Sequence, residues 1–141
     1  MAMSLHLKII TPLRTVVETP VQSILLPSVE GQLEILPGHT GIISAVANGE
    51  LIYRAPEQGE VSLFVGGGFL QVEGDNALLV TDTAMAADEM DPDSITAAIE
   101  LAQKDLRNSD SVLSREEQLR LEALISKQLA MLEYKNTRRK H

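Results

Sequence analysis

The stretch Glu30-Gly31-Gln32-Leu33-Glu34-Ile35-Leu36-Pro37-Gly38-His39-Thr40 decides how the first part of this sequence folds. Within it, the apolar residues Leu33 and Ile35 alternate with polar ones, and glycine or proline lies on each side of the alternation. An alternation with period two places one face of a strand on a core and the other in water. The stretch therefore predicts a short β-strand between two turns.

The same alternation recurs along the first 87 residues, at Leu5–Ile9, Leu51–Tyr53, Val61–Val65 and Leu70–Val72. Residues typical of turns separate these runs about every ten residues, a rhythm that favours an antiparallel sandwich or barrel over βαβ units. The predicted turns are Thr11-Pro12, Thr19-Pro20, Pro27 to Gly31, Pro37-Gly38, Asn48-Gly49, Pro56 to Gly59 and Gly74 to Asn76. Gly66-Gly67-Gly68 lies between two runs and predicts a sharp bend or bulge.

The composition changes near residue 87, because all nine glycines precede it and Ala, Leu, Glu, Gln and Lys dominate after it. Asp91 followed by Pro92 predicts a capped helix start, and Ser114 to Glu117 forms a capping box that predicts a second start. The first helix has its apolar stripe at Ile95, Ile99, Ala102 and Leu106; the second has Leu121, Ile125, Leu129 and Leu132, widened by Leu124 and Met131.

The predicted fold class is therefore β + α, with an N-terminal antiparallel β-sandwich over residues 1–87 and a C-terminal antiparallel two-helix hairpin over residues 88–141. Short helices are marginal in isolation, and pairing two of them adds only a small core. We expect the hairpin to be stable when docked and mobile when undocked, as suits an arm that changes position.

The formal net charge of −8 is unevenly distributed over the 141 residues. Residues 1–87 hold 3 basic and 9 acidic residues, residues 88–134 hold 5 and 11, and residues 135–141 hold four basic residues and no acid. An acidic body argues against binding nucleic acid, whose affinity depends on neutralising phosphates. The basic tail either docks on an acidic partner or is a solubilising helix end.

Several chemistries are excluded or weakly supported by the residues. The chain has no cysteine, no apolar run of the ~20 residues that span a bilayer, and no signal peptide at its first residues. The glycine triplet lacks the lysine of a phosphate loop, and the acidic residues 88–93 lack the spacing of an EF-hand. His39 is not framed by a nucleophile motif, so a small hydrolase using His39 with Asp82 is the weakest hypothesis. The residues favour a non-enzymatic binding or regulatory component without a cofactor.

Four segments then resemble one known family. Residues 30–40 are similar to the pattern E-G-x-L-G-I-L-P-G-H-A of the F-type ATP synthase epsilon subunit, Gly67 to Val72 to its G-G-F-x-x-V, and Val80 to Ala84 to its A-D-x-A strand. Lys8 to Pro12 resembles its opening strand. The order of these segments and the predicted plan of a sandwich followed by a hairpin agree with the family over essentially the whole chain.

Two departures from the family pattern bear on function. Glu34 stands where the family usually has Gly. Many members carry an I/L-D-x-x-R-A motif for ATP at the start of the first helix, and here Asp91 is kept while Ser94 replaces the Arg. A hydroxyl cannot replace the charged fork that a guanidinium offers to phosphate. The sequence therefore predicts no cofactor.

The resemblance implies a non-catalytic central-stalk subunit that couples proton flow through the c-ring to ATP synthesis and inhibits ATP hydrolysis through its C-terminal helices. The implied partners are the gamma subunit, the c-ring loops and the beta and alpha subunits of the catalytic head, at the cytoplasmic face of a bacterial inner membrane and only peripheral to it. Its implied rotor contacts are Glu30, Gln32, Leu33 and His39. Its implied inhibitory arm includes Arg115, Arg120, Lys127, Lys135, Arg138, Arg139 and Lys140. The alternative is a free-standing acidic β-sandwich adaptor whose hairpin binds another helix.

Overall fold

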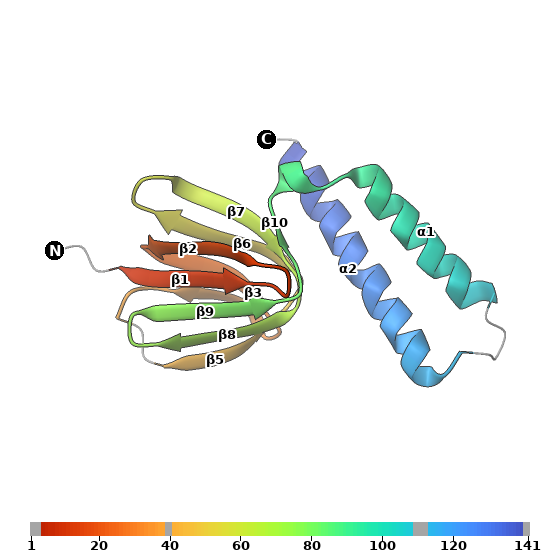
Figure 1. Ribbon diagram of the computed structural model, residues 1–141, viewed down its shortest axis with the longest axis horizontal. Helices are drawn as coiled ribbons and strands as arrows, with labels where there is room; N and C mark the ends of the chain where they lie inside the picture. The colour runs from red at the N-terminus through yellow and green to blue at the C-terminus, as the bar shows by residue number, and fades with distance from the viewer. Residues whose placement is uncertain (1–3, 39–40, 109–112, 140–141) are drawn as a thin grey trace. The chain divides into compact units, whose positions relative to one another are not determined.

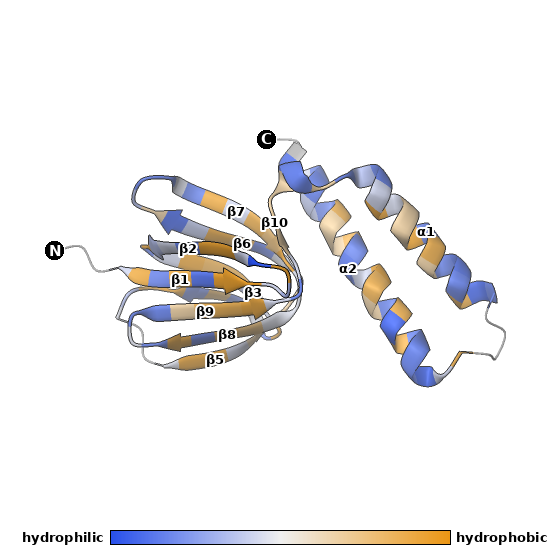
Figure 2. Cartoon of the chain, in the orientation of Figure 1, coloured by the Kyte–Doolittle hydropathy of each residue, from blue (hydrophilic) through white to orange (hydrophobic). Residues whose placement is uncertain are grey.

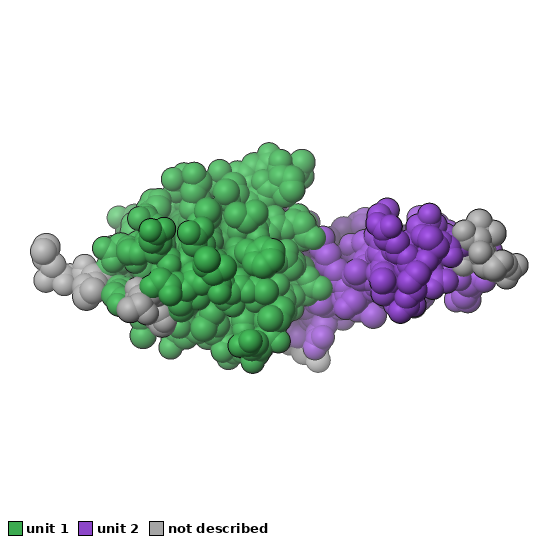
Figure 3. Space-filling view, turned by 90° about the horizontal axis from the view of Figure 1, so that it is seen from below, with its two compact units in different colours: residues 1–86 green, residues 87–141 purple. Residues whose placement is uncertain are grey.

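The computed structural model describes residues 4–38, 41–108 and 113–139, so His39 and Lys140 lie outside the described residues. The chain divides into two compact units, residues 1–86 and residues 87–141, which are coloured separately in Figure 3. The first unit is made of strands and the second of helices, as the change of composition predicts. Each unit is described by itself below.

The first unit contains short strands joined by turns (Figure 1). The predicted alternation of buried and exposed side chains is present in Leu5–Ile10, Gly49–Ala55 and Gly68–Glu73. It fails at the end of Gly59–Val65, where Leu63, Phe64 and Val65 are all buried. The strands are β1 (Leu5–Ile10), β2 (Thr15–Val21), β3 (Ser23–Ser28), β4 (Gly31–Ile35), β5 (Ile42–Val46), β6 (Gly49–Ala55), β7 (Gly59–Val65), β8 (Gly68–Glu73), β9 (Asn76–Thr81) and β10 (Ala84–Met85).

The strands form two halves that close on one core. One half has the order β10-β7-β6-β3, with β4 on the other side of β3, and the second half has the order β5-β8-β9-β1-β2. The pair Ser28–Val46 joins β3 to β5 and thus joins the halves. All pairings are antiparallel except that of β1 with β9. This arrangement confirms the predicted β-sandwich.

The core of the sandwich is aliphatic, as expected for a chain with two Phe, two Tyr and no Trp. Its fully buried side chains come from both halves, among them Leu5, Leu7, Ile9, Ile24, Leu26, Ile35, Leu51, Leu70 and Leu79. Burying one such side chain stabilises a fold by roughly 1.5–3 kcal/mol. The alternating residues of the strands thus supply most of the favourable energy of this unit.

One predicted turn is wrong, because Thr19-Pro20 lies within β2. The turn predicted over Pro27 to Gly31 is present at Val29 and Glu30 but is shorter than predicted, since Pro27 belongs to β3 and Gly31 to β4. Proline cannot donate a ladder hydrogen bond, so it is confined to positions where none is needed. β2 is the last strand of its half, and β3 pairs with β6 only over Ser23–Leu25. Both prolines therefore occupy positions that a sheet tolerates.

The glycine triplet forms the predicted bend between β7 and β8, and Thr81 holds it. The buried Thr81 hydroxyl lies 2.8 Å from the carbonyl oxygen of Gly66 and 3.1 Å from that of Thr83. A Cβ on Gly68 would overlap the carbonyl oxygen of Val80 and lie 2.9 Å from the Cα of Thr81. Only glycine allows the backbones of β8 and β9 to approach this closely at Gly68.

The second unit consists of a short 3₁₀ turn, η1 (Ala87–Glu89), and the helices α1 (Pro92–Asn108) and α2 (Arg115–Arg139), which pack against each other. Both predicted caps are present. Asp91 Oδ1 accepts the amide of Asp93 at 3.1 Å, and Ser114 Oγ accepts the amide of Glu117 at 3.1 Å. These caps satisfy amides that the first turn leaves without a helical partner.

The predicted stripe of α2 is wrong at Leu124 and Leu129, which are 39% and 49% exposed. The buried residues in that half of the helix are Met131 and Tyr134. Residues two apart on an α-helix are rotated by about 200°, so Leu129 and Met131 point to nearly opposite sides. A single packing partner such as α1 can bury only one of these two side chains, and the sequence alone does not say which.

Candidate functional site

The outer side of the β5-β8-β9-β1-β2 half carries apolar side chains where a solvated sheet would carry polar ones. Phe69 is 65% exposed, Val80 49% and Ile43 78%. The ladder places Phe69 opposite both Ala45 and Val80, and Val80 beside Ile10. We call this surface the apolar face and define it by Ile10, Ile43, Ala45, Phe69, Leu78 and Val80. Hydrophobic residues dominate β5 and β9 in Figure 2.

One end of the apolar face is hollowed. A depression of about 440 Å³ lies between the β1–β2 turn and the start of β8. Its wall is mostly apolar and includes Ile10, Pro12, Phe69 and Val80. Exposed apolar side chains scattered singly need no explanation, but a contiguous patch with a depression marks an interaction surface.

The sequence held a signal for the apolar face that strand alternation does not capture. Residues 77–80 are Ala-Leu-Leu-Val, four apolar residues in a row. In an antiparallel sheet with one wet face, every second residue should be polar. A strand that is apolar on both sides therefore predicts a covering partner for its outer face.

The β3–β4 turn presents the predicted rotor contacts that the structure describes. Ser28 Oγ donates to the carbonyl oxygen of Gly31 at 2.6 Å and accepts the amide of Glu30 at 3.2 Å, which fixes the turn. Glu30 and Gln32 are exposed. Leu33 is half-buried, pairs with Leu26 and packs against the core, so its side chain is less available to a partner.

The basic residues predicted for the arm do not form one free patch. Arg115 is exposed, and Arg120 lies 3.5 Å from Glu116 on the same helix. The guanidinium of Arg138 stands 5.9 Å from the centre of the Tyr134 ring. Lys127 is half-buried, and Arg139 is the last residue of α2. Solvated i,i+4 pairs contribute little stability, so Arg120 keeps its charge available.

Lys135 instead makes a contact within the second unit. Its ammonium donates to the carbonyl oxygen of Ala87 at 2.7 Å and thereby ties α2 to η1. Close by, the Ser94 hydroxyl donates to Asp91 Oδ2 at 2.8 Å. That hydrogen bond, the amide of Asp93 and the charge of Lys135 lower the pKa of Asp91. The start of α1 is thus stabilised by groups of this chain.

Replacing Lys135 by Met is expected to loosen this contact, because methionine keeps the apolar stem and removes the ammonium. Losing a hydrogen bond to a charged group costs about 1.5–3 kcal/mol. Amide hydrogen exchange in η1 and the first turn of α1 should become about tenfold faster. Lys104→Met, at an exposed position of α1, is the matched control and should leave exchange unchanged. Equal exchange rates in both variants would show that the Lys135 ammonium does not stabilise η1 or the first turn of α1.

Comparison with known proteins now identifies the family. Residues 4–87 match the family model described as "ATP synthase, Delta/Epsilon chain, beta-sandwich domain". The chain belongs to the ATP synthase delta/epsilon family. A curated relative, the ATP synthase epsilon chain of Synechococcus elongatus, is 38% identical over 105 residues, covering 74% of this chain and 76% of the relative. The ATP synthase epsilon chain of Trichodesmium erythraeum is 30% identical over 131 residues, which cover 93% of this chain and 95% of the relative.

Two solved structures have a similar fold. A chain in the mitochondrial ATP synthase of Euglena gracilis, solved as an OSCP/F1/c-ring assembly, superposes with a TM-score of 0.70 at 19% identity, covering 91% of this chain and 79% of that one. A chain in the central stalk/c-ring of the Tetrahymena thermophila mitochondrial ATP synthase superposes with a TM-score of 0.62 at 10% identity. The superposition covers 96% of this chain and 97% of that one. At these identities the likeness shows the fold alone.

Two absences hold for the described part of this family member. Neither α1 nor α2 has the length and apolarity that crossing a bilayer requires. Within residues 4–38, 41–108 and 113–139, no group of three His, Asp or Glu side chains is arranged to hold a metal ion.

Proposed function

We propose that this chain is a non-catalytic subunit of the central stalk of an F-type ATP synthase, coupling rotation of the c-ring to the catalytic head. Membership of the delta/epsilon family and the apolar face support this proposal. A sheet face with Phe69 and Ile43 in water has the composition of the core of an obligate interface. The gamma subunit is the partner that we assign to this face.

The β3–β4 turn is the second contact in the proposal. Exposed Glu30 and Gln32, on a turn held by the Ser28 hydroxyl, suit the polar loops of the c-ring. Leu33 would act behind them through its packing, and His39 belongs to the same stretch of sequence. This attachment would make the chain peripheral to the membrane, on the side where the catalytic head lies, which in a bacterium is the cytoplasm.

The helical unit is assigned the regulatory role. Its exposed Arg115 and Arg120 carry charges that an acidic surface of the beta or alpha subunits could bind, and the same role is proposed for Lys127, Arg138, Arg139 and Lys140. Lys135 would be available only after leaving the carbonyl of Ala87. A partner can favour one arm position only through different affinities for the two positions.

Removing residues 88–141 tests the regulatory role. The truncated chain keeps the whole sandwich and should still assemble with gamma and the c-ring. ATP hydrolysis by the assembled enzyme is expected to rise at least about fivefold, the lower range of allosteric coupling. Hydrolysis is measured against the enzyme with the full chain at equal occupancy. An unchanged rate would remove inhibition from the proposal and leave the stalk role standing.

We propose further that no nucleotide binds at the start of α1. The Ser94 hydroxyl is engaged by Asp91, and the position offers no guanidinium to phosphate. Isothermal titration of the chain with MgATP is expected to give no saturable heat up to about 1 mM. A dissociation constant of that size corresponds to a binding free energy of roughly −4 kcal/mol. Saturable binding that Ser94→Ala abolishes would contradict this.

A further inference from the structure

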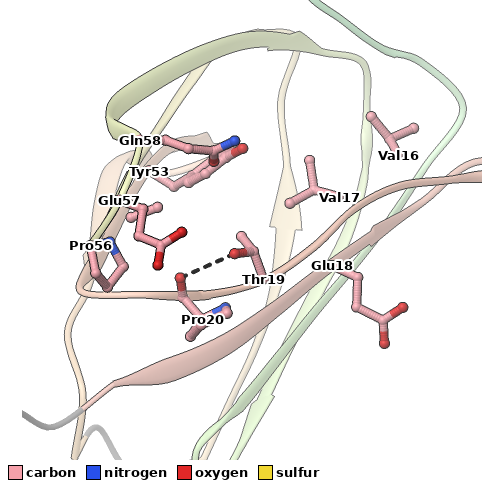
Figure 4. A pocket seen from close by; sticks show the side chains of 10 residues that line it. Val16, Val17, Glu18, Thr19, Pro20, Tyr53, Pro56, Glu57 and Gln58 are labelled. Atoms are coloured by element: carbon pink, nitrogen blue, oxygen red, sulfur yellow. Dashed lines mark hydrogen bonds between the residues drawn. The ribbon is translucent and has the colours of Figure 1, made fainter.

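A cavity of about 490 Å³ lies between β2 and the end of β6 (Figure 4). It shares no lining residue with the apolar face. Its lining residues are Val16, Val17, Glu18, Thr19, Pro20, Tyr53, Ala55, Pro56, Glu57 and Gln58. The volume falls in the range of small-molecule sites, about 300–1,000 Å³. The rotor function proposed above does not use this cavity.

Tyr53 is the buried polar group of the cavity. Only 5% of the residue is exposed, and within the described residues its hydroxyl makes no hydrogen bond. No side-chain oxygen in this part of the chain is both fully enclosed and unpaired, so the Tyr53 hydroxyl keeps some accessible surface, and the residue lines the cavity. Burial of the ring raises the pKa of Tyr53. An accessible, unpaired hydroxyl at a cavity wall is a group that a ligand can satisfy.

Glu57 supplies the charge. Figure 4 shows its carboxylate directed into the cavity, and the described residues offer it no hydrogen-bond or ion-pair partner. Glu18 points away from the cavity and lies 3.5 Å from His6 Nε2. None of the lining residues is Lys, Arg or His. The cavity therefore disfavours phosphates and carboxylates and favours a cation.

The remaining groups narrow the class of cation. Val16, Val17 and Pro56 are apolar and suit methylene groups. The Thr19 hydroxyl already donates, at 3.5 Å, to the carbonyl oxygen of Pro20, so its lone pairs remain free to accept. A primary ammonium has three N–H donors and no acceptor, which matches the carboxylate, the tyrosine oxygen and the threonine oxygen.

We propose that this cavity binds a primary alkylammonium group, with Glu57 holding the charge, Tyr53 and Thr19 accepting N–H donors and the two valines contacting the alkyl chain. The group could belong to a free amine or to a lysine side chain of a protein. This site is independent of the stalk role, so the failure of either proposal leaves the other intact.

Titration of the ¹⁵N-labelled full chain, followed by amide chemical shifts, tests the site with n-butylammonium and with Nα-acetyl-lysine-methylamide. Both probes are expected to shift residues 16–20 and 53–58 saturably. Tighter binding of the first would indicate a free amine as the natural ligand, and tighter binding of the second a lysine side chain. Butanoate, with the opposite charge, should leave these residues unshifted.

Glu57→Gln should weaken binding at least about tenfold, the loss expected for one charge-assisted hydrogen bond. Glu57 is exposed, so this variant should fold normally. Glu73→Gln removes the same charge from an exposed position at the end of β8 and should bind like the native chain. The proposal is overturned if neither probe shifts these residues at 50 mM, a dissociation constant that corresponds to a binding free energy of roughly −2 kcal/mol. It is also overturned if butanoate shifts them equally, or if Glu57→Gln binds the probes as well as Glu73→Gln does.

Discussion

Phe69→Asp is expected to abolish binding of this chain to the gamma subunit. Phe69 is the largest side chain of the apolar face, is 65% exposed and stands opposite Val80 in the ladder. Large aromatic residues at the centre of an interface commonly account for 2–4 kcal/mol of binding, and the aspartate adds a charge that the interface would have to desolvate. We expect the dissociation constant to rise at least about 100-fold, measured by titration calorimetry with purified gamma.

A matched control separates lost binding from lost folding. Leu101→Asp places the same charge at an apolar residue that is 62% exposed on α1, outside the apolar face. This variant should bind gamma like the native chain. Both variants should keep native circular dichroism, because neither replaced side chain is buried. Unchanged affinity of Phe69→Asp would assign gamma to another surface.

Gly68→Ala is expected to cause the largest loss of stability among single methyl additions to this sandwich. The new Cβ would overlap the carbonyl oxygen of Val80, and the Cα of Thr81 is also within 2.9 Å. Both neighbours are backbone atoms in the β8–β9 ladder and cannot rotate away. We expect the free energy of unfolding to fall by about 3 kcal/mol or more, measured by urea denaturation.

Gly67→Ala is the neighbouring control. Its Cβ would meet only the carbonyl oxygen of Val46 at 3.6 Å, which is ordinary van der Waals contact. The free energy of unfolding should change by less than about 1 kcal/mol. Equal midpoints for the two variants would show that the close approach at Gly68 relaxes at no cost.

The parts of the fold that local chemistry determines could be predicted from the sequence. Period-two alternation found strands such as β1 and β8, and the side-chain caps Asp91 and Ser114 located both helix starts within a residue. The alternation does not predict β2 or β3, because their prolines indicate turns locally, nor β5, in which apolar residues occupy nearly every position. Whether a proline interrupts a strand depends on which edge of that strand is paired, and pairing is a tertiary property.

The candidate site was harder to predict than the fold. The motif at residues 30–40 pointed to the β3–β4 turn, while the apolar face arises from side chains of four strands that no single segment reveals. Register decides that Ala45, Phe69, Val80 and Ile10 share a row. The hydrogen bond of Lys135 could not be predicted for a similar reason, because its partner Ala87 is 48 residues away along the chain.

The parallel pairing of β1 with β9 sets the order in which this protein can fold during synthesis. β1 ends at Ile10, and β9, which pairs with it on the side opposite β2, begins only at Asn76. Until the ribosome has released that later segment, the N-terminal hairpin has one side open and its leucines lack most of their final neighbours. Such long-range pairing slows folding and prolongs exposure to aggregation. The N-terminal hairpin is therefore most exposed to aggregation before residues 76–81 have been synthesised.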